Sequence, residues 1–133
     1  MSDDIKELTE QLRRFADERD WEQFHSPKNL AMALAGECGE VLEHFQWLTE
    51  QQSSDLDDVT RREVGHELAD VFLYTLRLAD RLDINLVEST KGKLQINAER
   101  YPADRVRGDA RRAGAYLRDD NNVIAPSNGE NIE

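Results

Sequence analysis

Apolar residues recur at helical spacing in four stretches of this chain, and no stretch shows the strict alternation of a half-buried strand. The four stretches cover about residues 3–20, 26–45, 58–82 and 86–100. The second opens at Ser26-Pro27, where Ser is a good N-cap and Pro at the first helical position loses no bonded N–H. The spacing therefore predicts an all-α fold, which we expect to be a four-helix bundle.

The chain has 133 residues, which suits a single domain, and its apolar density falls after Pro102. We expect residues 1–102 to form the folded domain and residues 103–133 to form a flexible polar arm. The arm begins with an Arg-rich segment that suits a short surface helix, and it ends in a tail predicted to be disordered, residues 119–133. The polar segment 49–58 is expected to be a loop between the second and third helices.

The charge balance narrows the classes of partner. The chain has 17 Lys and Arg against 28 Asp and Glu, a net charge of -11, whereas a duplex nucleic-acid binder normally presents a basic face. No apolar run approaches the roughly 18–20 residues needed to cross a bilayer, and the N-terminus lacks the pattern of a secretion signal. The single cysteine, Cys38, excludes an internal disulfide. We therefore expect a cytoplasmic protein that binds neither nucleic acid nor membranes.

Two carboxylate pairs stand at i, i+3 spacing, Glu37 with Glu40 and Glu67 with Asp70. The members of such a pair share one face of a helix. A loop of about ten residues permits the second and third helices to pack antiparallel, so that the two pairs face each other. Four carboxylates held together repel one another unless protons or a cation are present. Because oxygen-only ligands suit hard cations, the pattern suggests a site for Mg²⁺ or Mn²⁺.

The alternative is that these acids are ordinary solvated charges, since E-x-x-E is common in a chain with 28 acidic residues. Two features favour the metal site. The acids border apolar stripes instead of lying on an all-polar face. Gly36 and Gly39 also lie in the second helix, where each costs about 1 kcal/mol relative to Ala. The close approach of a helix or a ligand would account for both glycines.

Further residues suit a nucleotide. Tyr74 follows Asp70 by one helical turn, and Lys93 and Asn97 share a face of the fourth helix. A phenol, an ammonium group and an amide beside a carboxylate–metal cluster would suit a polyphosphate. On spacing alone, Lys93 is equally an exposed surface lysine, and Tyr74 is equally a half-buried core aromatic.

Two tryptophans flank the first acidic helix in a chain that is poor in aromatic residues. Trp21 and Trp47 could each stack on a nucleobase, an interaction of about 1–3 kcal/mol. The alternative is that both are core or subunit-interface anchors.

Several motifs, in this order, resemble the MazG-type all-α nucleoside triphosphate pyrophosphohydrolases, and among them the dCTP pyrophosphatase branch. The resemblance covers about residues 8–102 and includes Glu37-x-x-Glu40 followed by Glu67-x-x-Asp70. The matching stretches are ERDWEQFH at 18–25, GECGEVLEHFQW at 36–47, ELADVFLY at 67–74 and KLQINAERYP at 93–102.

The resemblance implies a Mg²⁺-dependent enzyme that splits a nucleoside triphosphate, dCTP or a modified dCTP, into the monophosphate and pyrophosphate. It assigns the metal to Glu37, Glu40, Glu67 and Asp70, with Glu37 or Glu40 as the general base. It assigns the substrate to Trp21, His25, Trp47, Tyr74, Lys93 and Asn97, with the tryptophans at the base and Lys93 and Asn97 at phosphate oxygens.

The family also forms homo-oligomers, so the resemblance implies a tetramer built as a dimer of dimers, or a dimer. The chain departs from the family at three positions of these motifs: His66 replaces an acid that many relatives carry, Leu12 aligns with a histidine of vertebrate relatives, and Cys38 stands where relatives usually have an aliphatic residue. The alternative function is a non-catalytic module that binds a nucleotide or forms a helical oligomer.

Overall fold

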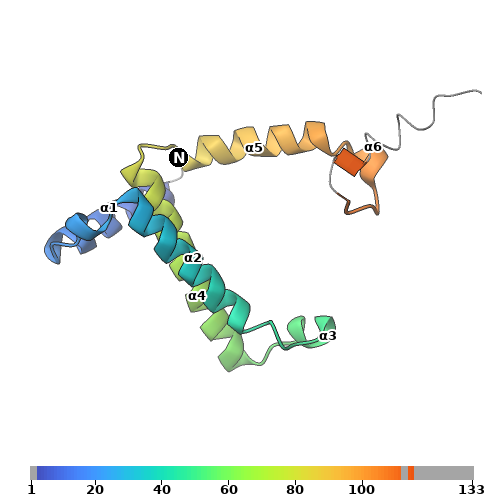
Figure 1. The fold of residues 1–133 in the computed structure, drawn as a ribbon, viewed down its shortest axis with the longest axis horizontal. Helices are drawn as coiled ribbons and strands as arrows, with labels where there is room; N and C mark the ends of the chain where they lie inside the picture. Colours follow the sequence, from blue (N-terminus) through green and yellow to red (C-terminus); the bar gives the residue numbers. More distant parts are fainter. Residues whose placement is uncertain (1–2, 112–113, 116–133) are drawn as a thin grey trace, which may run out of the picture. The chain divides into compact units, whose positions relative to one another are not determined.

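The structure is a computed structural model that describes residues 3–111 and 114–115, and this part of the chain is helical with no strand (Figure 1). The elements are α1 (Asp3–Glu18), the 3-10 turn η1 (Glu22–Phe24), α2 (Pro27–Glu43), α3 (Glu50–Ser53), α4 (Asp58–Arg81), α5 (Leu86–Arg100) and α6 (Ala103–Val106). The four predicted helices are confirmed as α1, α2, α4 and α5. The tail predicted at 119–133 lies outside the described residues.

Side-chain caps fix where the helices begin. The Ser26 hydroxyl accepts a hydrogen bond from the Asn29 N–H at 3.2 Å, with Pro27 as the first helical residue of α2. The Asp57 carboxylate accepts from the Thr60 N–H at 2.7 Å and so begins α4.

The segment predicted as a loop contains α3, and this part of the prediction was wrong. Thr49 and Gln52 form a capping box, in which each side chain accepts a hydrogen bond from the backbone N–H of the other residue. This reciprocal pair satisfies two N–H groups that a single helical turn would otherwise leave open.

Helix α4 is the central element of the first part of the chain, and α2 lies alongside it (Figure 1). His25, just before α2, contacts Arg77 near the C-terminal end of α4, whereas His44, just after α2, lies near Glu67. The two helices are therefore antiparallel, as predicted. Helix α1 packs on the C-terminal half of α4, where Arg13 pairs with Asp80 through a 2.8 Å Nε–Oδ2 hydrogen bond.

The buried core is small. Its apolar members are Ala16, Leu30, Val64, Leu76 and Ala79. Leu68 and Phe72 lie on α4 at the same four-residue spacing as the buried Val64 and Leu76, yet their exposed fractions are 54% and 40%. The hydrogen bond between α1 and α4 lies further along α4, at Asp80. The apolar spacing of this helix therefore does not by itself determine which of its residues a single chain buries.

The chain divides into two units, Met1–Ser89 and Thr90–Glu133, and the division falls inside α5. The predicted boundary at Pro102 stays a prediction. Among the described residues, none of the helices combines the length and apolar character that a membrane span requires.

Candidate active site

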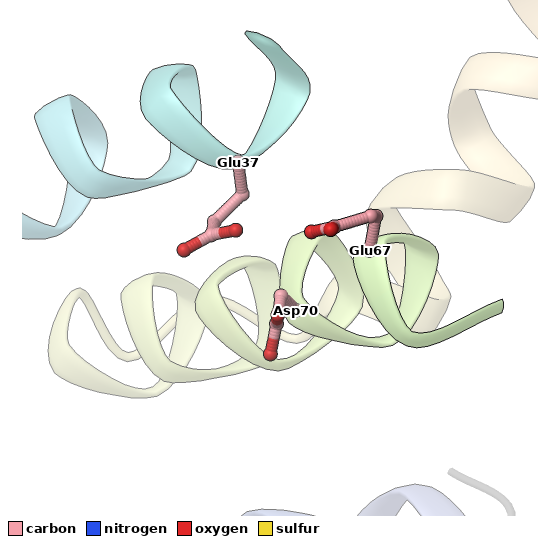
Figure 2. Close-up of side chains that lie close together, drawn as sticks. All are labelled: Glu37, Glu67 and Asp70. Atoms are coloured by element: carbon pink, nitrogen blue, oxygen red, sulfur yellow. The ribbon is translucent and has the colours of Figure 1, made fainter. Parts of the chain in front are cut away.

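Three of the four predicted metal ligands come together in the first unit. Figure 2 shows Glu37 on one helix facing Glu67 and Asp70 on the other. One carboxylate oxygen from each residue lies within 4.8 Å of the other two. The i, i+3 spacing brings Glu67 and Asp70 to one face of α4, and the antiparallel packing brings Glu37 of α2 to that face. All three residues are half-buried, so water screens their charges only in part.

The electrostatics of Glu37 reflect this crowding. Partial burial raises the pKa of its carboxyl group above the ordinary value, and the charges of Asp70, Glu67 and Glu40 raise it further. Each effect disfavours the charged form of the carboxyl group. In the absence of a cation, the three carboxylates therefore destabilise one another.

Glu40 lies one turn beyond Glu37 on α2 and is exposed, and the structure does not include it in the group of three. Gly36 and Gly39 flank Glu37 and face open space, since a Cβ added at either would meet no described atom within 4 Å. A neighbouring helix of the same chain is therefore the wrong explanation for these two glycines.

His44 stands at the edge of the carboxylate group. Its Nε2 lies 3.7 Å from an Oε of Glu67, so a protonated ring would form an ion pair with that ligand. Both side chains are only partly exposed, at 21% and 23%, so water would screen the attraction between the two charges less than on the open surface.

A pocket of about 260 Å³ adjoins the carboxylate group. It is lined by Leu12, Phe15, Trp21, His25, Asp70, Leu73, Tyr74 and Arg77. Asp70 belongs to both the carboxylate group and this pocket, so a molecule in the pocket would reach the acids. Trp21, His25 and Tyr74 were each predicted to bind substrate, and the structure places all three on this lining.

The walls of the pocket combine aromatic faces with polar groups. The Trp21 ring meets the Phe15 ring edge-on, with their centroids 5.6 Å apart, and lies 6.3 Å from the His25 ring. Such a lining suits a flat, partly polar ligand.

Arg77 is the residue of this lining that the sequence analysis missed. Its exposed fraction is only 4%, and its Nε donates a 3.2 Å hydrogen bond to Nδ1 of His25. The available signal was spacing, because Arg77 follows Asp70 by seven residues and Tyr74 by three, which places all three on one side of α4.

The remaining predicted residues lie elsewhere. Trp47 follows α2 with an exposed fraction of 86% and is not part of the pocket lining. Lys93 and Asn97 lie on α5 in the second unit, where Lys93 is exposed and Asn97 is half-buried. Their roles at the site stay predictions.

Comparison with known proteins supports the resemblance to the MazG-type family. A model of the MazG-like family matches residues 33–114. Over 109 residues the chain is 42% identical to dCTP pyrophosphatase 1 of Homo sapiens, which covers 77% of this chain and 64% of that protein. The Mus musculus protein of the same name is 43% identical over 107 residues, which covers 76% of this chain and 63% of that protein.

A crystal structure described as a pyrophosphatase from Archaeoglobus fulgidus is also similar. Its TM-score is 0.72 and its sequence identity 38%, with 77% of this chain and 95% of that chain covered. Against the curated relatives, by contrast, the chain spans a little under two thirds of their length.

Proposed function

Because the chain belongs to the MazG-like family, we propose that it hydrolyses a nucleoside triphosphate to the monophosphate and pyrophosphate. We propose that the reaction requires Mg²⁺ and that the substrate is dCTP or a modified dCTP, in keeping with the names of the similar proteins. The observation that carries this proposal is the convergence of Glu37, Glu67 and Asp70 beside an aromatic pocket that shares Asp70.

The carboxylate group fits a hard divalent cation. Its three donors are all oxygens, the ligands that Mg²⁺ prefers and Mn²⁺ accepts. The pKa of Glu37 is raised by burial and by its acidic neighbours, so a cation held there would relieve the repulsion. In this proposal Glu37, Glu67 and Asp70 hold the ion, and Glu40 completes the set. A bound ion would neutralise phosphate charge and make a coordinated water more acidic.

The other proposed roles are those of the general base and of the side chains that bind the substrate. We propose that Glu37 or Glu40 acts as the general base, since a carboxylate beside the attacking water can accept its proton. Trp21 would provide an aromatic face for the nucleobase, and Tyr74, one turn from Asp70 on the pocket lining, would lie close to the sugar or the phosphates.

Three further predicted residues complete this proposal. Lys93 and Asn97 would bind phosphate oxygens, an ammonium group and an amide being suitable donors for that role. Trp47 would bind the base or a neighbouring subunit, since a tryptophan so exposed is suited to a ligand or a partner.

We also propose that the protein is a homo-oligomer, either a tetramer built as a dimer of dimers or a dimer. Large apolar side chains are exposed on both central helices, among them Met32 on α2 and Leu68 and Phe72 on α4. Burial of apolar area is worth roughly 25 cal/mol per Å², so a second copy that covers these side chains would stabilise the fold. We also propose a cytoplasmic location, because a chain with the single cysteine Cys38 has no internal disulfide of the kind that small exported proteins often carry.

The test is pyrophosphate release from a panel of canonical and modified nucleoside triphosphates, with and without Mg²⁺. The variants are Glu37→Gln and Glu40→Gln, with Glu43→Gln as a control that makes the same charge change on the same helix. We expect release that is greatest for dCTP-type substrates, requires Mg²⁺, is lost in the first two variants and persists in the control. If no triphosphate is hydrolysed, nucleotide binding would distinguish a binding module from a purely structural one.

A further inference from the structure

A hydrogen bond between α4 and the segment before α2 fixes one face of the pocket. The Nε of Arg77 donates to Nδ1 of His25 over 3.2 Å. Building on the proposed function, we propose that Arg77 is a positioning residue that holds His25 as its Nε2–H tautomer. In this proposal the Nε2–H group recognises a hydrogen-bond acceptor on the substrate's nucleobase.

The chemistry of the two side chains determines the tautomer. A guanidinium group carries only donors, so the ring nitrogen that it meets must be unprotonated. A neutral imidazole has one N–H, and with Nδ1 occupied as an acceptor that N–H is on Nε2. His25 therefore offers a donor, and its residue lines the pocket.

The surroundings of His25 keep the ring neutral. Burial lowers its pKa below the ordinary value, and the positive charges of Arg77 and Arg81 lower it further, while Glu22 opposes them. These are the charged groups that face the ring from α4 and from η1. At neutral pH the ring consequently acts as a fixed neutral donor.

The backbone of His25 is held as firmly as its ring. Arg81 Nε donates to the His25 carbonyl over 3.1 Å, and the His25 N–H donates to the Glu22 carbonyl over 3.1 Å. Arg77 and Arg81 each place an Nη atom 3.6 Å from the same Oε of Glu22. The arginines of α4 thus hold the turn that carries both Glu22 and His25.

Burial of the Arg77 guanidinium group lowers the stability of the fold. Its Nη1 lies 3.4 Å from Asp80, whereas its buried Nη2 makes no hydrogen bond in the described chain and has the Glu22 carboxylate 3.6 Å away. A buried charge with an unsatisfied donor destabilises a fold, and an apolar residue at this place would avoid that cost. The hydrogen bond to His25 gives the charge a role at the pocket.

The remainder of the lining explains why a base is the expected ligand for this donor. Leu12, Phe15 and Trp21 form apolar and aromatic walls, on which a nucleobase can stack. A stacked base must still satisfy its polar edge, which for a pyrimidine includes a carbonyl oxygen. A neutral N–H donor provides that contact without attracting the phosphates, whereas a charged imidazolium would compete for them.

Nitrogen-15 NMR of the three histidines measures the tautomer directly in the full chain, and His25→Gln assigns the signal. We expect wild-type His25 to carry its proton on Nε2 alone. Arg77→Met should introduce a measurable Nδ1–H population, because Nδ1 is no longer occupied. Arg61→Met is the matched control, since Arg61 lies exposed on α4 and pairs with Asp58. A proton on Nδ1 in the wild type, or identical tautomers in wild type and Arg77→Met, would overturn the proposal.

Steady-state kinetics with dCTP then test recognition. We expect His25→Leu and Arg77→Met to raise KM about tenfold with a smaller change in kcat, which corresponds to one hydrogen bond. His25→Gln should recover most of the loss, because its amide keeps an N–H donor. Equal kinetics for the Gln and Leu variants would refute recognition by the donor.

The two proposals fail in different ways. If the wild type hydrolyses no triphosphate, the proposed function fails. The NMR measurement would still test the tautomer of His25. Titrations of the wild type and His25→Leu with dCTP, followed by chemical shift, would still test recognition of the base. Circular dichroism and thermal unfolding show whether Arg77→Met is folded, and Arg77→Lys provides a second variant that keeps the positive charge.

Discussion

Replacing Glu37 by Gln should stabilise the protein in the absence of divalent cations while it abolishes turnover. Two unit charges 4.8 Å apart repel by about 0.9 kcal/mol in water and by about 3.5 kcal/mol at an effective dielectric constant of about 20. Glu37 faces two such charges, those of Glu67 and Asp70, and it is half-buried. The raised pKa of Glu37 reflects this repulsion, and protonation of Glu37 relieves part of it. We therefore expect a gain of about 1–2 kcal/mol in the free energy of unfolding.

The gain should depend on pH. A carboxyl group whose pKa is higher in the folded state than in the unfolded chain favours folding at low pH, when it is protonated in both states. That contribution is lost as the pH rises from the ordinary value of 4.5 through the raised folded value of Glu37. The advantage of Glu37→Gln over the wild type should therefore be absent below pH 4.5 and complete above the folded pKa.

The assay is urea unfolding with EDTA at fixed protomer concentration, repeated with Mg²⁺. Glu43→Gln controls for the reduction of a net charge of -11, since it removes one exposed acid from the same helix. We expect Mg²⁺ to stabilise the wild type and the control but to stabilise Glu37→Gln little. Destabilisation of metal-free Glu37→Gln, or an equal gain in Glu43→Gln, would refute the electrostatic account of the site.

Three other changes test separate parts of the structure. Asp80→Asn should cost about 1–3 kcal/mol at pH 7, because it removes a carboxylate whose pKa is held below the ordinary value of 3.8, chiefly by the hydrogen bond from Arg13. The wild type should lose that stability only as the pH falls through the lowered pKa, and urea unfolding at several pH values would measure the loss. Phe72→Ser should lower the oligomeric state in sedimentation velocity while helicity is retained, and an unchanged oligomer would exclude this face from the interface. Trp21→Ala should raise KM for dCTP by about tenfold with little change in kcat, as determined by pyrophosphate release.

The features that the sequence predicted well are those that neighbouring residues determine. Periodicity and a cap such as Ser26 act within a few residues, and the helices they predicted are present. The facing of Glu37 toward Glu67 and Asp70 needed one further step, the antiparallel return of the chain, which the short connection favoured. The same reasoning overlooked α3, although Thr49 and Gln52 carry its capping box at the expected spacing.

The features that the sequence did not reveal depend on contacts between distant segments. Leu68 and Phe72 carry the same periodic signal as Val64, yet only packing decides which of them a single chain buries. Arg77 was missed for the opposite reason, because a search for apolar stripes passes over a buried charge. Its partner His25 stands 52 residues away, a separation at which spacing gives no guidance.

On helix α4, a substitution in the site is expected to change both activity and stability. Glu67, Asp70, Tyr74, Arg77 and Asp80 follow one another at intervals of three or four residues, so they form one continuous polar band on a central helix. The band begins in the carboxylate group, passes along the pocket and ends at the ion pair with α1. A substitution anywhere in it alters the charges that its neighbours experience. Activity alone therefore cannot assign a role to one of these residues, and each substitution must be read together with stability and a matched control on the same helix.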